Sequence, residues 1–99
     1  MKKAFIAAAL AAVPLAATAQ DSPAARSLAA TCANCHGTDG RSATPEVSAL
    51  AGVPKKDLLD KLKAFRDGSR PATVMQQLAK GYSDEQLELI ADYFSRRPR

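Results

Sequence analysis

The chain has 99 residues, with 14 Lys or Arg, 10 Asp or Glu and one His, which gives a formal net charge of +4. This length is enough for one small domain. Its basic residues form no run interleaved with aromatic residues, and their densest group is Arg96, Arg97 and Arg99 at the tail, so we expect no nucleic-acid partner.

The first 19 residues have the pattern of a secretory signal peptide. Lys2 and Lys3 precede an apolar run over residues 4–15, and Ala17-Thr18-Ala19 has the small side chains of a cleavage site. The run is shorter than the about 20 residues of a membrane span, so an uncleaved anchor is the weaker interpretation. We predict cleavage after Ala19, a mature domain over residues 20–99, a periplasmic location and no membrane span after cleavage.

A first helix is predicted to begin at Ser22-Pro23, a capping residue followed by proline at the first helical position. Ala25, Leu28, Ala29 and Cys32 then recur at the spacing of one helical face. This face leads directly to the two cysteines of the chain.

The cysteines lie in the sequence Cys32-Ala33-Asn34-Cys35-His36, which is the C-x-x-C-H pattern of covalent c-type haem attachment. In this pattern each thiol adds to one vinyl group of the porphyrin, and His36 is placed under the ring as the proximal iron ligand. A mature chain of about 80 residues buries little apolar surface and often needs a disulfide, a metal or another bound group to be stable. We predict that one haem c provides this stabilisation.

Three other interpretations of Cys32 and Cys35 agree less well with the sequence. A thioredoxin-like redox pair needs a βαβ context, and no segment has a strand pattern. A zinc site would have only Cys32, Cys35 and His36, which are too close together in the chain to surround a tetrahedral metal. A structural disulfide would close too small a loop to stabilise much of the chain.

Two further helices are predicted after a turn-rich loop over residues 38–45. One spans residues 55–66 and ends at the C-cap glycine Gly68. The other begins at Ser83, which has Gln86 three residues later in a capping-box pattern. The apolar side chains of the middle helix are Leu58, Leu62 and Phe65. Those of the last helix are Leu87, Ile90, Ala91 and Phe94.

Met75 is the candidate for the distal iron position. The mature chain has no second histidine, and Met75 is its one methionine because Met1 is lost with the signal peptide. It follows Arg70-Pro71, which places it on a connecting segment rather than within a long helix. A lone methionine is usually a gap-filler in a core, but beside a C-x-x-C-H motif it predicts a thioether ligand that raises the reduction potential.

From about Ala25 to Phe94 the chain resembles the class I c-type cytochromes. The resemblance implies an all-α fold in which the N- and C-terminal helices cross, while a middle helix and loops wrap one haem. It also implies that Pro45, nine residues after His36, provides the backbone carbonyl that accepts the Nδ1 proton of this histidine.

Four shorter segments resemble the cytochrome subunit of flavocytochrome c sulfide dehydrogenase and related di-haem cytochromes. They are Leu50-Ala51-Gly52, Phe65-Arg66-Asp67-Gly68, Val74-Met75 and residues 79–85. The first two are shared across that wider group, and Lys80-Gly81-Tyr82 is the form that favours the sulfide dehydrogenase subunit. With one C-x-x-C-H motif, the resemblance implies a mono-haem electron-transfer protein, not a catalyst by itself, that accepts electrons from a flavoprotein subunit. A free shuttle between respiratory or photosynthetic complexes is the alternative, and a haem sensor with a labile Met75 is a third.

Overall fold

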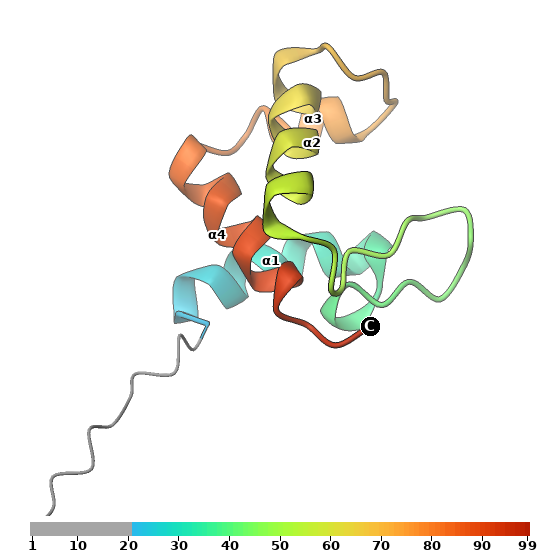
Figure 1. Cartoon of the computed structure of the whole chain (residues 1–99). Helices are drawn as coiled ribbons and strands as arrows, with labels where there is room; N and C mark the ends of the chain where they lie inside the picture. The colour runs from blue at the N-terminus through green and yellow to red at the C-terminus, as the bar shows by residue number, and fades with distance from the viewer. Residues whose placement is uncertain (1–20) are drawn as a thin grey trace, which may run out of the picture.

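The computed structural model describes residues 21–99, and over this range it contains helices and no strand, which confirms the all-α fold (Figure 1). The helices are α1 (Pro23–His36), α2 (Lys55–Asp67), α3 (Met75–Ala79) and α4 (Asp84–Ser95), with a short 3-10 helix, η1 (Thr38–Gly40), after α1. None of these helices is long and apolar enough to cross a membrane. The predicted signal peptide lies outside the described residues.

The predicted start of α1 is confirmed. The backbone N–H of Ala25 donates to Ser22 Oγ over 3.1 Å, which pairs one of the amides that the first turn of a helix leaves without a partner. Pro23 occupies the first helical position, where no amide hydrogen is needed. Ala25 and Ala29 are buried, and Leu28 is half-buried beside them.

The start of α4 is a complete capping box, as predicted. The Gln86 N–H donates to Ser83 Oγ over 3.2 Å, and the Ser83 N–H donates to Gln86 Oε1 over 2.9 Å. The whole predicted apolar stripe of this helix is buried, with 2% or less of each residue exposed, at Leu87, Ile90, Ala91 and Phe94.

The core lies where α1 crosses α4 and where α2 packs against α4 (Figure 1). Ala29 of α1 and Ala91 of α4 are both in this core, and their small side chains let the two helices approach closely. Leu58 is the buried contribution of α2. The crossing of the N- and C-terminal helices, predicted from the resemblance, is therefore present.

The middle helix α2 extends one residue beyond its predicted end. Gly68 then adopts a left-handed conformation with φ of 81°, and its N–H donates to the Phe65 carbonyl over 3.2 Å. Leu58 is buried, but Leu62 and Phe65 are only half-buried. The predicted apolar face of α2 is thus only partly covered by the protein itself.

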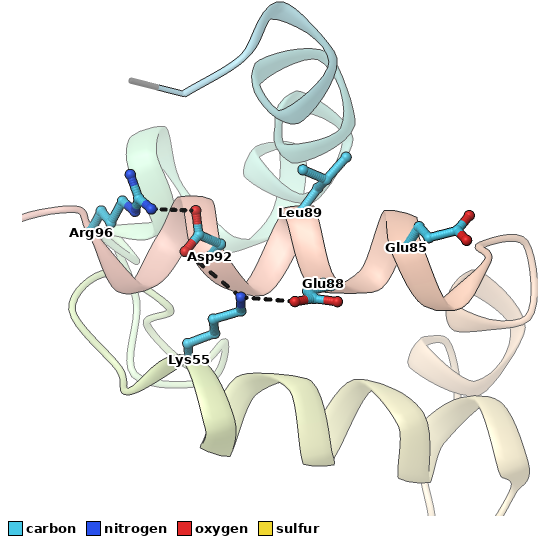
Figure 2. A pocket seen from close by; sticks show the side chains of 6 residues that line it. All are labelled: Lys55, Glu85, Glu88, Leu89, Asp92 and Arg96. Carbon is cyan, nitrogen blue, oxygen red and sulfur yellow. Dashed lines mark hydrogen bonds and ion pairs between the residues drawn. The ribbon is translucent and has the colours of Figure 1, made fainter. Parts of the chain in front are cut away.

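An open groove of about 420 Å³ runs between the start of α2 and the outer face of α4 (Figure 2). Lys55 reaches across it, with Nζ 3.1 Å from Glu88 Oε1 and 3.9 Å from Asp92 Oδ1. Arg96 also pairs with Asp92, over 3.1 Å. The two pairs of Lys55 join α2 to α4, whereas the Arg96–Asp92 pair lies at the end of α4 itself. No residue of the C-x-x-C-H motif lines the groove.

The turn after α1 is held against α4 by a tyrosine. Tyr93 Oη donates to Asp39 Oδ1 over 3.0 Å, and Asp39 has a positive φ of 55°, which is uncommon for a residue other than glycine. The next residue, Gly40, accepts hydrogen bonds at its carbonyl from the N–H groups of Leu50 and Ala51, over 2.8 and 3.1 Å. The loop over residues 41–49 is therefore closed at its base.

Candidate functional site

The C-x-x-C-H motif occupies the last turn of α1, so a single helical turn carries both thiols and the imidazole. Cys32 is half-buried against the core, whereas Cys35 is exposed. The structure has no disulfide between them, contrary to the structural-disulfide interpretation. Within residues 21–99 no three His, Cys, Asp or Glu side chains converge as a metal-binding group, contrary to the zinc interpretation.

The electrostatics at Cys32 do not suit a dithiol redox catalyst. Burial raises the pKa of the Cys32 thiol above its ordinary value of 9.0, and the contact between this thiol and the Thr31 hydroxyl opposes that rise only in part. Nucleophilic cysteines of thioredoxin-like pairs need a lowered pKa, because the thiolate is the reactive form. Such pairs also follow a strand, and the described range has none.

His36 is oriented by a backbone carbonyl, but not by the one predicted. Its Nδ1 lies 2.6 Å from the carbonyl oxygen of Ser48. A carbonyl only accepts, so Nδ1 carries the proton and Nε2 keeps the lone pair that a metal ligand needs. The assignment of this role to Pro45 is wrong in this structure.

The path of the loop explains the error. The hydrogen bonds from Leu50 and Ala51 to Gly40 close the loop over residues 41–49 just after Gly37, the residue that follows His36. Ser48 stands two residues before this closure and so returns beside the imidazole, whereas Pro45 is exposed farther out in the loop. The number of residues between His36 and Pro45 does not reflect this geometry. The signal that points to Ser48 is its position two residues before Leu50, where the loop closes.

Met75 is the first residue of α3, which differs slightly from the predicted connecting segment. The helix has only five residues and belongs to the link between α2 and α4, so Met75 is not within a long helix. Its side chain is half-buried, and α3 packs against α2. We call residues 70–82, which carry Met75, the distal segment.

A hydrogen bond that the sequence analysis missed joins the distal segment to the last turn of α1. Thr31 Oγ1 lies 2.9 Å from Tyr82 Oη, across 51 residues of sequence. Thr31 directly precedes Cys32, so the two ends of this bond belong to the turn with the thiols and to the segment with Met75. No short motif carries a signal for such a pairing.

The residues around these groups have the apolar character that a porphyrin requires. Half-buried side chains of α1, α2 and the loop pack on the core without being covered, among them Leu28, Leu50, Val53, Leu59 and Leu62. Val74 and Leu78 flank Met75 and are 56% and 50% exposed. Among residues 21–99 no polar or charged residue is buried. The two thiols and the imidazole of α1, with apolar side chains packed beside them, form a donor set that fits haem c.

The sequence matches the family model of cytochrome c over residues 22–96. The chain belongs to the cytochrome c family. It therefore binds covalently attached haem c and serves electron transport, and the predicted class of protein is confirmed. The spacing of Cys32, Cys35 and His36 is that of haem attachment.

Three relatives show where this cytochrome stands within the family. It is 43% identical over 67 residues to the cytochrome subunit of sulfide dehydrogenase of Chlorobaculum tepidum, covering 68% of this chain and 60% of that protein. It is 40% identical to cytochrome c4 of Pseudomonas aeruginosa, covering 82% of this chain and 40% of the relative. It is also 40% identical to cytochrome c-554(548) of Halomonas halodenitrificans, covering 78% of this chain and 96% of the relative.

A solved structure agrees with the fold. Cytochrome c4 of Acidithiobacillus ferrooxidans superposes with a TM-score of 0.65 at 29% identity, covering 79% of this chain and 52% of that one. This cytochrome thus spans 60% or less of the sulfide dehydrogenase subunit and of the Pseudomonas cytochrome c4.

Proposed function

We propose that this cytochrome is exported to the periplasm, its signal peptide being cleaved after Ala19, and carries single electrons as the electron-accepting subunit of a flavoprotein such as sulfide dehydrogenase. The observation that carries the proposal is the last turn of α1, where Cys32, Cys35 and an oriented His36 stand together. Haem iron supplies the one-electron chemistry when bound, by alternating between ferric and ferrous.

Each site residue has a separate part in this proposal. Cys32 and Cys35 hold the porphyrin through thioether bonds, and His36 is the proximal ligand through Nε2, with Nδ1 donating to Ser48. Met75 would be the second protein ligand of the iron. With His36 and Met75 both holding it, the iron would have no position for a substrate, so the chain would transfer electrons and would not itself catalyse a reaction on a small molecule.

The flavoprotein partner is supported by the sulfide dehydrogenase subunit of Chlorobaculum tepidum, which is 43% identical to this chain. A free electron shuttle is the second candidate, and a specific observation favours it as well. The aligned region, which is 78% of this chain, covers 96% of cytochrome c-554(548), so that relative is itself a single domain of about this size.

Size-exclusion chromatography of native periplasmic extract tests both candidates. Haem and flavin absorbance are followed together, and the haem-containing protein is identified by its mass after denaturation. We expect haem and flavin to co-elute well above the mass of a lone mature chain, with sulfide as the first substrate to assay. Elution of the haem protein alone as a small species overturns the subunit proposal in favour of the shuttle. Its absence from the periplasmic fraction contradicts export.

The substitution Met75→Ala tests the distal ligand. We expect loss of the methionine-to-iron absorption band of the ferric protein and a lower reduction potential, because a thioether favours ferrous iron. A haem sensor whose iron position was already open would show the same spectrum before and after the change. Gln77→Ala, an exposed position two residues away on α3, is the matched control and should keep both properties.

A further inference from the structure

The distal segment is attached to the rest of the molecule at both ends. At its start, the Arg70 N–H donates to the Ala64 carbonyl over 3.2 Å, and the Arg70 guanidinium lies 5.3 Å from the centre of the Phe65 ring. Gln76 Nε2 donates back to the Arg70 carbonyl over 2.8 Å, which ties the first turn of α3 to this end. These bonds fix the segment to α2.

At its other end the segment is attached to α1 by Tyr82. The direction of this hydrogen bond follows from counting protons. Thr31 has one hydroxyl hydrogen, and its Oγ1 lies 2.8 Å from the Leu28 carbonyl, which only accepts. Thr31 therefore donates to Leu28, and Tyr82 donates to Thr31 over 2.9 Å. The Thr31 hydroxyl is thus a donor to Leu28 and an acceptor from Tyr82. The hydrogen of the Tyr82 hydroxyl is the one that joins the distal segment to α1.

Between these two ends, α3 has little burial to hold it in place. Ala79 is 1% exposed, but it is the only buried residue of the helix, while Val74 and Leu78 are at least half exposed. A methionine sulfur is a weak hydrogen-bond acceptor and a weak metal ligand. Retention of such a ligand depends on how closely the surrounding segment keeps it in position, because each opening of the segment gives a competing ligand access.

We propose that Tyr82 is a positioning residue for the distal ligand, and that its hydrogen bond to Thr31 sets how readily Met75 leaves the iron. This inference rests on the proposed ligation by Met75. The bond joins the turn of α1 that carries the cysteines to the turn that follows α3, so it fixes the distal segment relative to the attachment point of the porphyrin. Its loss loosens α3 at the end that α2 does not hold.

The test uses the ferric holoprotein and the variants Tyr82→Phe and Thr31→Val. Two quantities are measured: the rate at which added imidazole displaces the methionine ligand, and the hydrogen exchange of backbone amides over residues 75–81. We expect each variant to raise both rates about 2- to 10-fold, which is the range for one lost hydrogen bond. The double variant should be no faster than the faster single variant, because both substitutions remove the same bond.

Tyr93→Phe is the matched control. It removes the same hydroxyl group from the other tyrosine of the chain, whose hydrogen bond to Asp39 belongs to the packing of η1 on α4. We expect it to lower the global stability but to leave imidazole displacement at the wild-type rate. A Tyr82→Phe protein with wild-type displacement and exchange rates overturns the inference, as does an equal acceleration by Tyr93→Phe.

The wild-type spectrum separates this inference from the proposed function. If the unsubstituted ferric protein lacks the methionine-to-iron band, ligation by Met75 fails and the positioning role fails with it. If the band is present and Tyr82→Phe changes nothing, only the positioning role fails.

Discussion

The part of the chain that carries His36 and the distal segment that carries Met75 are stabilised in different ways. On the proximal side α1, η1 and α4 bury their contacts, and the apolar stripe of α4 is almost completely inaccessible. On the distal side the segment with Met75 has one buried residue, Ala79, and relies on hydrogen bonds at its ends. His36 thus follows a packed framework, whereas Met75 lies on a segment with few buried contacts, and segments of that kind open at low free-energy cost.

This difference in burial predicts that most of the free energy of unfolding comes from the framework, that is, from α1, η1 and α4. Phe94→Ala should lower the free energy of unfolding by about 3–5 kcal/mol, because Phe94 is 1% exposed and its removal leaves a cavity in the core. Gln77→Ala, an exposed change in the distal segment, should stay within about 0.5 kcal/mol of wild type. Denaturant unfolding of the holoprotein measures both. Equal losses in the two variants would show that the framework does not dominate stability.

Two glycines with similar positive φ sharpen the comparison: Gly40 ends η1 in the packed part, and Gly68 follows α2 just before the distal segment. Gly40 has φ of 77°, and an added Cβ would lie 2.7 Å from Phe94 Cδ1 and 3.0 Å from the Ala51 nitrogen. Gly68 has φ of 81°, and an added Cβ would meet nothing within 4 Å. Both alanine variants bear the left-handed strain of about 1 kcal/mol. Gly40→Ala should lose about 1–3 kcal/mol more through overpacking.

Thermal and denaturant unfolding of the two variants, compared directly, isolate the packing contribution. Because the backbone strain is common to both, their difference reports the space around each glycine. A Gly68→Ala protein as unstable as Gly40→Ala would mean that the surroundings of Gly68 are packed far more tightly than the open space around it indicates.

The same division separates what the sequence could predict from what it could not. Ser22, Ser83 and Gly68 marked the helix ends correctly, because capping depends on residues within four positions of one another. The C-x-x-C-H motif could be recognised because its residues, too, lie within four positions of one another. The stripe of α4 was predicted because a helix repeats its buried positions at a fixed interval.

Contacts between distant segments were not predictable in this way. The bonds from Tyr82 to Thr31 and from Tyr93 to Asp39 join residues 51 and 54 positions apart. The Ser48 carbonyl reaches His36 because of where the loop over residues 41–49 closes. Pro45 was favoured because it stands nine residues after His36 in the sequence, a spacing that does not reflect the path of the loop in space. Local physical rules hold for helix ends and periodic faces, whereas loop closure depends on the assembled core.

Ser83 lies where the two sides meet, directly after Tyr82 and at the N-cap of α4. Ser83→Ala should lower the free energy of unfolding by about 1 kcal/mol, because the amide of Gln86 loses its acceptor. Ser95→Ala, at the other end of the same helix, removes a hydroxyl that donates only to the nearby Asp92 carbonyl and should change stability less. Hydrogen exchange should localise the Ser83 effect to the first turn of α4. Faster exchange spread evenly over α4 would contradict this prediction.

The smallest expected effect is a pH dependence on the framework side. Burial raises the pKa of the Tyr93 phenol above its ordinary value of 10.0, and its hydrogen bond to Asp39 adds to the rise. The unfolded chain therefore releases this proton at lower pH than the folded chain does. The stabilisation from the neutral phenol is fully present below about pH 10 and is lost as the pH rises through the folded-state pKa.

The difference in free energy of unfolding between wild type and Tyr93→Phe isolates this group, because lysines that titrate in the same range contribute equally to both proteins. We expect the difference to be constant from about pH 7 to 9 and to shift against the wild type above about pH 10. A difference that stays constant at high pH would place the hydroxyl in a solvated environment and would contradict the hydrogen bond to Asp39 as the contact that raises the pKa of Tyr93.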